Sequence, residues 1–252
     1  MNLLIIQARM GSTRLPGKVL MNINHQSILE NLVERITPSK KVDQIIIATT
    51  TNPEDDAIEQ LCRAKNWNFF RGSDWDVLSR FYGATAQFEH VENVIRVTSD
   101  CPLHTHKVVD FVVDEFLKAE VDYFSNSNNE PDFLEDGFDT EVFTYKALET
   151  AFQEATKLSE REHVTPYIKF SGKFKCAWKK SNINYTYKMS VDSPDDFEAV
   201  KAIFEELKNT PDFGINEVTL LLQQHPEIIA KNKNSVANSG YVKSIQNDRE
   251  VK

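Results

Sequence analysis

A cationic loop follows the first apolar segment of the chain and has the residue types that bind phosphate groups. Within residues 7–18, QARMGSTRLPGK, three cations alternate with glycine and small hydroxyl residues. Backbone N–H groups of a Gly/Ser loop, flanked by Arg and Lys, form a cradle for several phosphates. We therefore predict a polyphosphate site made by Ala8, Arg9, Gly11, Ser12, Arg14 and Lys18. A solvated surface loop with a Pro-Gly turn is the alternative.

The spacing of this loop differs from the two common phosphate-binding patterns. Five residues separate Gly11 from Gly17, and Val19 follows Lys18. A P-loop needs four residues between its glycines and Ser or Thr after its Lys. The loop also lacks the GxGxxG pattern, which disfavours a dinucleotide-binding fold.

Two aspartates each follow an apolar segment and precede a turn and a helix. Asp100 lies in RVTSDCPL and Asp192 in MSVDSP. Two carboxylates, phosphate oxygens and water molecules are the usual ligands of protein-bound Mg²⁺. The pair therefore predicts a Mg²⁺ site beside the cationic loop. Taken singly, either aspartate also fits a helix N-cap or a loop.

Five further residues have two interpretations each. Asp139 and Glu141, at a spacing of two in a strand, share one face and either bind acceptor hydroxyls or form a dimer contact. Arg161 and His163 either bind an acceptor carboxylate or belong to a capped helix with surface ion pairs. Arg71, after a strand, either reaches a nucleotide or forms a surface ion pair.

Three motifs resemble functional sites but have simpler explanations. Asp74 and Asp76 form the DxD pattern of metal-dependent glycosyltransferases, yet they also fit the acidic first turn of a capped helix. His104 and His106 have no Cys or third His nearby to complete a metal site. Cys101 has no adjacent base that would activate it, so we expect it to pack in the core.

Strands and helices are expected to alternate through the first 120 residues. The expected strands are Leu3–Ala8, Gln44–Thr49, Asn68–Arg71 and Asn93–Thr98, and the expected helices are 27–36, 53–65, 74–88 and 106–118. Continuous Ile- and Val-rich runs indicate strands buried on both faces. The alternation predicts an α/β fold with a doubly wound, mostly parallel sheet, whose ligands bind at the carboxyl ends of the strands.

The pattern changes after residue 120. We expect strands at 121–125, 138–143, 174–178 and 187–191, and helices at 145–156, 160–170, 193–207 and 216–224. The alternating segment 138–143 is typical of an antiparallel or edge strand. The chain is predicted to be one domain, 1–225, with its core in 1–120 and 171–207 and an acceptor or dimer region in 121–170. The polar residues 226–252 are predicted to be a loose tail.

The composition excludes several classes of protein. The chain has 252 residues, 40% of them hydrophobic and 27% charged, with a formal net charge of −9. This acidic balance argues against nucleic-acid or membrane partners. No apolar run approaches the length of about 20 residues that a membrane helix needs, and the N-terminus reads as a buried strand. The three cysteines form no CxxC pair, so we expect reduced thiols and a cytoplasmic protein.

Five ordered motifs resemble one known family. QARMGSTRLPGK, TSDCPL, DGFDTEVF, SEREHVTPYI and SVDSPDDF occur in that order within residues 1–207. Together they are similar to the spore-coat polysaccharide cytidylyltransferases, relatives of the CMP-KDO and acylneuraminate cytidylyltransferases. The match is to the form with RMGSTRLPGK rather than the RGGSK form of the sialate enzymes.

The resemblance implies both a fold and a reaction. The fold is the nucleotide-diphospho-sugar transferase (Rossmann-like) three-layer sandwich with a small antiparallel extension. The reaction is Mg²⁺-dependent transfer of CMP from CTP to a sugar, expected to be a keto-sugar acid, with release of pyrophosphate by a homodimer. The positions that match the triphosphate-binding residues are Arg9, Gly11, Ser12, Arg14 and Lys18. Those that match the metal ligands are Asp100 and Asp192.

In that reaction the catalytic residues would be Arg9, Lys18, Asp100 and Asp192. Cations beside the leaving pyrophosphate would stabilise its developing charge, and the transfer needs no dedicated base. Two alternatives remain open. One is a glycosyltransferase that uses Asp74 and Asp76 with a nucleotide-sugar donor, and the other is a non-catalytic nucleotide-binding protein.

Overall fold

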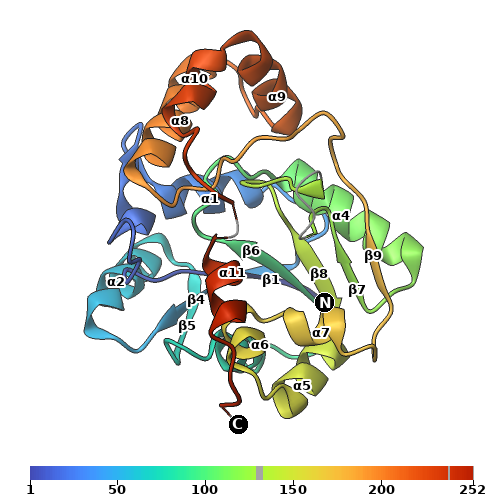
Figure 1. Cartoon of the computed structure of the whole chain (residues 1–252). Coiled ribbons are helices and arrows are strands. Elements are labelled where there is room, and N and C mark those ends of the chain that lie inside the picture. Colours follow the sequence, from blue (N-terminus) through green and yellow to red (C-terminus); the bar gives the residue numbers. More distant parts are fainter. Residues whose placement is uncertain (129–132, 238, 252) are drawn as a thin grey trace.

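A seven-stranded sheet forms the centre of the protein in a computed structural model, which describes residues 1–128, 133–237 and 239–251 (Figure 1). The strand order is β5-β4-β1-β6-β8-β7-β9. Its members are β1 (Asn2–Gln7), β4 (Gln44–Thr50), β5 (Asn68–Gly72), β6 (Asn93–Thr98), β7 (Tyr123–Ser125), β8 (Glu141–Thr144) and β9 (Cys176–Trp178). Only β8 among them is antiparallel to its neighbours. The predicted mostly parallel sheet with an antiparallel part is confirmed. A hairpin of β2 (Asn22–Ile23) and β3 (Gln26–Ser27) was not predicted.

Helices cover both faces of the sheet. On one side pack α1 (Ile28–Ile36), α2 (Asp56–Lys65), α4 (His106–Ala119), α8 (Pro194–Glu206) and α9 (Ile215–Gln224). On the other side pack α3 (Val77–Thr85), α5 (Tyr145–Glu154), α6 (Leu158–His163) and α7 (Pro166–Phe170). Short 3₁₀ turns, η1 (Lys18–Leu20) and η2 (Pro53–Asp55), and the C-terminal helices α10 (Pro226–Lys231) and α11 (Ser239–Gln246) complete the set. None of these helices is long and apolar enough to cross a membrane.

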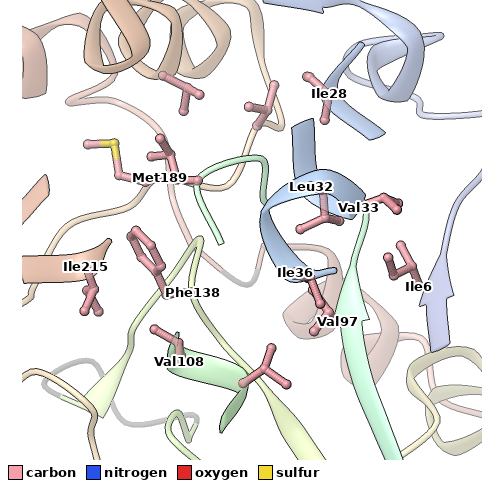
Figure 2. Close-up of a cluster of buried hydrophobic side chains, with 14 of the residues drawn as sticks. Ile6, Ile28, Leu32, Val33, Ile36, Val97, Val108, Phe138, Met189 and Ile215 are labelled. Atoms are coloured by element: carbon pink, nitrogen blue, oxygen red, sulfur yellow. The ribbon is translucent and has the colours of Figure 1, made fainter. Parts of the chain in front are cut away.

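Strand β1 shows why the sheet is buried on both faces. Leu4 and Ile6 point into the core with α1 and α4, whereas Leu3 and Ile5 point into the core with α3 and α5. All four side chains are fully buried. Figure 2 shows Ile6 and the α1 side chains within the first of these cores. An unbroken apolar run is therefore what this central strand requires.

The helix that was expected over 160–170 is broken in two. Helix α6 ends at His163, and α7 begins at Pro166. Between them Val164 has a φ of 70°, a left-handed conformation that helices do not contain. Pro166 also has no N–H to continue the hydrogen bonding of α6, although it is well suited to the first position of a new helix.

Residues 187–191 do not form the strand that was predicted. The backbone N–H groups of Met189 and Ser190 donate to Oδ1 of Asp136, at 2.9 and 2.6 Å, rather than to a neighbouring strand. Gly137 lies against the same segment with a φ of 89°, and a Cβ there would be 2.9 Å from the carbonyl carbon of Met189. A side chain thus replaces the strand partner that the apolar pattern led us to expect.

The C-terminal residues are packed rather than loose. Ile228 of α10 is buried in the core beside α8. The Asp248 carboxylate accepts hydrogen bonds from the backbone N–H and the hydroxyl of Ser159, both at 2.9 Å. The Leu158 N–H donates to the carbonyl of Arg249 at 2.8 Å. These contacts with α6 lie far apart in sequence, so the polar composition of the segment gave no sign of them.

Candidate active site

Two adjoining cavities open at the carboxyl ends of β1 and β6, where the sheet rule predicts a ligand site. The larger has a volume of about 540 Å³ and the smaller about 250 Å³. They share the lining residues Gln7, Arg14, Thr98, Asp100, His163, Asp192 and Gly240. Because their walls are common, we treat them as the larger and smaller compartments of one cleft.

The cationic loop forms one wall of the larger compartment. Its lining residues there are Ala8, Arg9, Ser12, Thr13, Arg14 and Lys18. The loop is held in place by the Met10 N–H, which donates to Asp55 Oδ1 at 2.6 Å. Gly11 is not among the lining residues, but a Cβ at this position would lie 2.7 Å from Glu54 Oε1. Its role is therefore to let the loop pass close to Glu54.

The Lys18 ammonium joins the two predicted metal ligands. Lys18 Nζ lies 2.8 Å from Asp100 Oδ2, 3.0 Å from Asp192 Oδ1 and 2.7 Å from the Val191 carbonyl oxygen. Burial acts to lower the pKa of Lys18, but the two carboxylates outweigh it and the pKa is raised. Burial likewise acts to raise the pKa of Asp100, and Lys18 more than reverses this, so its pKa lies well below the usual range. Lys18 and Asp100 are therefore both charged at neutral pH.

The two aspartates are suited to hold a divalent cation. Both line the two compartments, so they face the point where the compartments meet. Their carboxylate oxygens are hard donors of the kind that Mg²⁺ prefers. The described residues contain no cluster of three or more His, Cys, Asp or Glu side chains arranged for a metal ion. Two carboxylates are a partial ligand set, which phosphate oxygens and water complete in many nucleotide sites.

Arg80 was missed by the sequence reasoning. It is 2% exposed, lines the larger compartment, and donates through Nη1 to the Ser73 carbonyl oxygen at 3.0 Å. Its Nε atom is buried without a hydrogen-bond partner among the described residues. Burial lowers the pKa of Arg80 to about 10, so the guanidinium keeps its charge at neutral pH. Arg80 lies within a largely apolar helix and outside any motif, so no sequence pattern indicated its position in the cleft.

The rim of the larger compartment carries a surface ion pair. Arg9 Nη1 lies 2.8 Å from Asp74 Oδ1, and both side chains are close to half exposed. Asp74 does not act together with Asp76, because the Asp76 carboxylate is buried against Arg161. The DxD pair is thus divided between the rim and the interior, which argues against the glycosyltransferase alternative.

Glu141 is fully engaged within the smaller compartment. Its Oε1 accepts from the Tyr123 hydroxyl at 2.6 Å and the Thr165 hydroxyl at 2.7 Å, and Oε2 pairs with Arg96. Lys169 Nζ lies 3.3 Å from Oε1. Burial acts to raise the pKa of Glu141, but the positive charges of Lys169 and Arg96 outweigh burial and hold the pKa well below its usual range. Glu141 shapes the compartment as an ion-paired wall.

Asp139 lines the same compartment with few partners. The hydrogen bond found for its carboxylate among the described residues is the long one from Cys101 Sγ to Oδ1, at 4.0 Å. Burial, followed by the nearby carboxylates of Asp136 and Asp100, raises the pKa of Asp139 to about 7. Asp139 and Glu141 thus both reach the smaller compartment, but only Asp139 changes its protonation state near neutral pH.

This pKa predicts a pH effect on stability. Because the folded pKa of Asp139 lies above the ordinary value of 3.8, the native state binds more protons than the unfolded state between pH 4 and 7. Stability should therefore fall as pH rises through that window. Asp139→Asn should remove this loss of stability. We expect the free energy of unfolding to change by at least about 1 kcal/mol less with pH, because one pKa unit corresponds to about 1.4 kcal/mol. Urea unfolding at pH 5 and pH 8 measures it, with the exposed Asp195→Asn as control. Equal pH dependence in wild type and Asp139→Asn would refute it.

The other three predicted binding residues differ in position. Arg161 is 3% exposed and paired with Asp76, so it is not placed to meet an acceptor. Arg71 lies outside both compartments, where its Nη1 pairs with Asp56 at 2.6 Å and Glu59 at 2.7 Å. Only His163 lines the cleft. Burial lowers its pKa to about 4, so its imidazole is neutral at pH 7.

The histidine and cysteine motifs that were set aside have structural roles. His104 is fully buried, and its Nε2 lies 2.7 Å from the Thr140 hydroxyl oxygen. His106 Nδ1 lies 3.3 Å from the Arg35 carbonyl oxygen. Cys101 is buried, and burial followed by the Asp139 charge raises the pKa of its thiol well above the ordinary value. A thiol of this kind is unreactive.

Helix α11 and Lys188 are further parts of the site that the sequence reasoning missed. Gly240, Tyr241, Lys243 and Ser244 line the cleft. Lys188 Nζ lies 3.4 Å from Asp192 Oδ2 and 2.8 Å from Asp196 Oδ2. The sequence did not predict the ion pair between Lys188 and Asp192, although they are four residues apart. The segment between them was expected to be a strand, in which these side chains would be too far apart to pair.

Comparison with known proteins agrees with this geometry. A family model described as cytidylyltransferase matches residues 3–229. The spore coat polysaccharide biosynthesis protein SpsF of Bacillus subtilis is 30% identical over 238 residues, which cover 89% of this chain and 95% of that protein. An uncharacterised protein of Methanocaldococcus jannaschii is 47% identical over 164 residues, 65% of each chain.

A solved structure supports the same assignment. A cytidylyltransferase from Leptospira borgpetersenii superposes with a TM-score of 0.83 at 30% identity, covering 90% of this chain and 96% of that one. The fold, the cleft at the ends of β1 and β6, and the extent of the family match lead to one assignment. The chain belongs to the cytidylyltransferase family of enzymes.

Proposed function

We propose that this protein transfers CMP from CTP to a hydroxyl of a keto-sugar acid, with Mg²⁺ as cofactor and pyrophosphate as the second product. The observation that carries the proposal is the position of Asp100 and Asp192, at the junction of a cation-lined compartment and a hydroxyl-lined one. The relative named for spore coat polysaccharide biosynthesis supports a role in surface polysaccharide synthesis.

We propose a cytoplasmic homodimer, for which exposed Phe170 and Trp178 near edge strand β9 provide an apolar surface.

The larger compartment is proposed to bind CTP. Arg9, Arg14 and Lys18 would contact the phosphate chain, and Ser12 would donate from its hydroxyl. Each of these three cations is held by a carboxylate: Asp74 for Arg9, Asp192 for Arg14, and both proposed metal ligands for Lys18. These ion pairs order the three side chains, which reduces the entropic cost of binding a substrate.

In the proposed step, the acceptor hydroxyl oxygen forms a bond to the α-phosphorus of CTP. The bond from that phosphorus to the oxygen bridging the β-phosphate breaks, and pyrophosphate leaves with the electron pair. The hydroxyl proton passes to solvent. Arg9, Arg14 and Lys18 stabilise the charge that develops on the leaving group. Mg²⁺ held by Asp100 and Asp192 would neutralise the α-phosphate oxygens and lower the pKa of the attacking hydroxyl.

The smaller compartment is proposed to bind the acceptor. Its lining residues with hydroxyl groups are Thr98, Ser125, Ser127, Thr165, Ser190 and Tyr241. Hydroxyl groups and the Asp139 carboxylate are suited to the several hydroxyls of a sugar. The motif resemblance to CMP-KDO and acylneuraminate cytidylyltransferases supports a sugar acid as the acceptor.

Nucleotide selectivity tests the proposal without an acceptor. With Mg²⁺ present, CTP should raise the thermal unfolding temperature, and a ligand at 100 times its Kd adds about 2.7 kcal/mol of stability. UTP, ATP, GTP and UDP-glucose should give smaller shifts at equal concentration. Differential scanning fluorimetry measures all five ligands in one series. A larger shift with UDP-glucose than with CTP would contradict cytidylyl transfer and favour glycosyl transfer.

A further inference from the structure

Helix α11 forms part of the cleft wall although it lies beyond the residues that match the family model. Figure 1 shows it in red, next to α6. Gly240 lines both compartments, Tyr241 the smaller, and Lys243 and Ser244 the larger. One short helix therefore borders both proposed substrates.

Polar contacts tie this segment to α6. The Ser244 hydroxyl donates to Glu162 Oε2 at 2.6 Å. The Tyr241 ring packs edge-on against His163, with a centroid distance of 5.1 Å and an interplanar angle of 85°. Beyond the helix, Asp248 accepts from Ser159, and the Val251 N–H donates to the Thr156 carbonyl at 2.8 Å. These contacts hold α11 in place at the face that borders the cleft and at residues 248 and 251, which follow the helix.

The orientation of α11 is the reverse of that of an ordinary surface helix. Val242 and Ile245 are 50% and 49% exposed, whereas Tyr241 and Ser244 face the cleft and α6. A surface helix normally buries its apolar stripe and exposes its polar face. The contacts with α6 account for the inward positions of Tyr241 and Ser244. Contact with a polar ligand would account for Lys243, which lines the larger compartment.

Lys243 is the side chain that indicates the ligand. Arg9, Arg14 and Lys18, which line the same compartment, are each paired with a carboxylate. Over residues 1–128, 133–237 and 239–251, no ion pair is found for Lys243. An unpaired ammonium at the wall of a compartment already rich in Arg and Lys is suited to an additional phosphate group.

We propose that α11 is a further wall of the nucleotide site, in which Lys243 binds the polyphosphate of the nucleotide and the Tyr241–His163 contact positions the helix. The identity of the nucleotide rests on the function proposed above, whereas the anion site does not. The C-terminal segment would thus contribute directly to substrate affinity.

Lys243→Gln tests the anion contact, with Lys233→Gln as the matched control. Lys233 is an exposed lysine in the same C-terminal segment, outside both compartments. Calorimetric titration with Mg²⁺–CTP and, separately, with inorganic tripolyphosphate should show affinity about tenfold lower for Lys243→Gln, the scale of one charge-assisted hydrogen bond. Lys233→Gln should bind like wild type. Unchanged affinity of Lys243→Gln for both ligands would overturn the inference while leaving CTP binding by wild type intact.

A second measurement follows the helix itself. Trypsin cleaves after Lys243, so Mg²⁺–CTP or tripolyphosphate should slow the appearance of that cut in wild type, as followed by mass spectrometry. Asp248→Ala, which removes the anchor at Ser159, should speed the cut and weaken both ligands. Protection by tripolyphosphate with no binding of CTP would support the anion site and refute cytidylyl transfer. A cut that neither ligand slows would refute the role of α11.

Discussion

Asp100→Asn is expected to lower kcat/KM for CMP transfer by about 10³-fold, the upper range for loss of one group that stabilises transition-state charge. The amide keeps the shape of the carboxylate but removes one of the two charges at the junction of the compartments. It also leaves Lys18 with Asp192 and the Val191 carbonyl as partners, so the loop should stay in place. Pyrophosphate release from CTP, coupled to a phosphate assay, measures the rate.

The control separates loss of charge from loss of fold. Asp195→Asn changes an exposed aspartate in the first turn of α8, three residues from Asp192 and outside the cleft. It should leave kcat/KM unchanged, and both variants should unfold within a few degrees of wild type. An Asp100→Asn enzyme with more than a tenth of the wild-type rate would contradict the metal-binding role of Asp100.

Arg161→Leu is expected to destabilise the protein by about 3–5 kcal/mol, the cost of leaving one partner of a buried ion pair without its counter-charge. Arg161 Nε lies 3.1 Å from both Asp76 carboxylate oxygens, and its Nη2 lies 2.5 Å from Oδ2. Arg161 also donates to the Phe152 carbonyl at 2.8 Å, which joins α6 to α5. Urea unfolding at pH 7 measures the change.

A double-mutant cycle makes the cause of the loss explicit. Removing Asp76 together with Arg161, as Asp76→Asn with Arg161→Leu, should recover a large part of the stability, because no unpaired buried charge remains. If Arg161 instead bound the acceptor, a different result would follow. If Arg161→Leu kept wild-type stability and only raised the KM for the acceptor, the structural role of the ion pair would be wrong.

The central sheet could be predicted because its signal is local. The apolar runs of β1 and β4 are continuous, and continuous runs occur where both faces of a strand are buried. The helix starts were predictable for the same reason. Ser27 caps α1 and Ser193 caps α8, each through residues three positions away in the chain.

The parts that depend on distant contacts could not be predicted. Arg161 looked available for an acceptor, but its partner Asp76 is 85 residues away. Helix α11 docks on α6 through hydrogen bonds that no composition reveals. Asp192 lines the cleft, although the strand assumed to deliver it does not form. Its position depends instead on the Val191 N–H, which donates to the Asp100 carbonyl at 2.8 Å, and on the amides bound by Asp136.

The contact between Asp136 and the backbone of residues 189 and 190 couples the smaller compartment to the segment that carries Asp192. Leu134, Asp136 and Asp139, which precede β8, line the smaller compartment. Under the proposed function, substitutions at these positions would change the specificity for the acceptor. Yet Asp136 and Gly137 also hold the backbone that carries Asp192. A loop grafted from a relative with another acceptor would keep catalysis only if it preserved an Asp-Gly pair at these two positions. Diversification is therefore constrained at positions 136 and 137, and also at Ser125, whose buried hydroxyl donates to the Thr140 carbonyl at 2.8 Å.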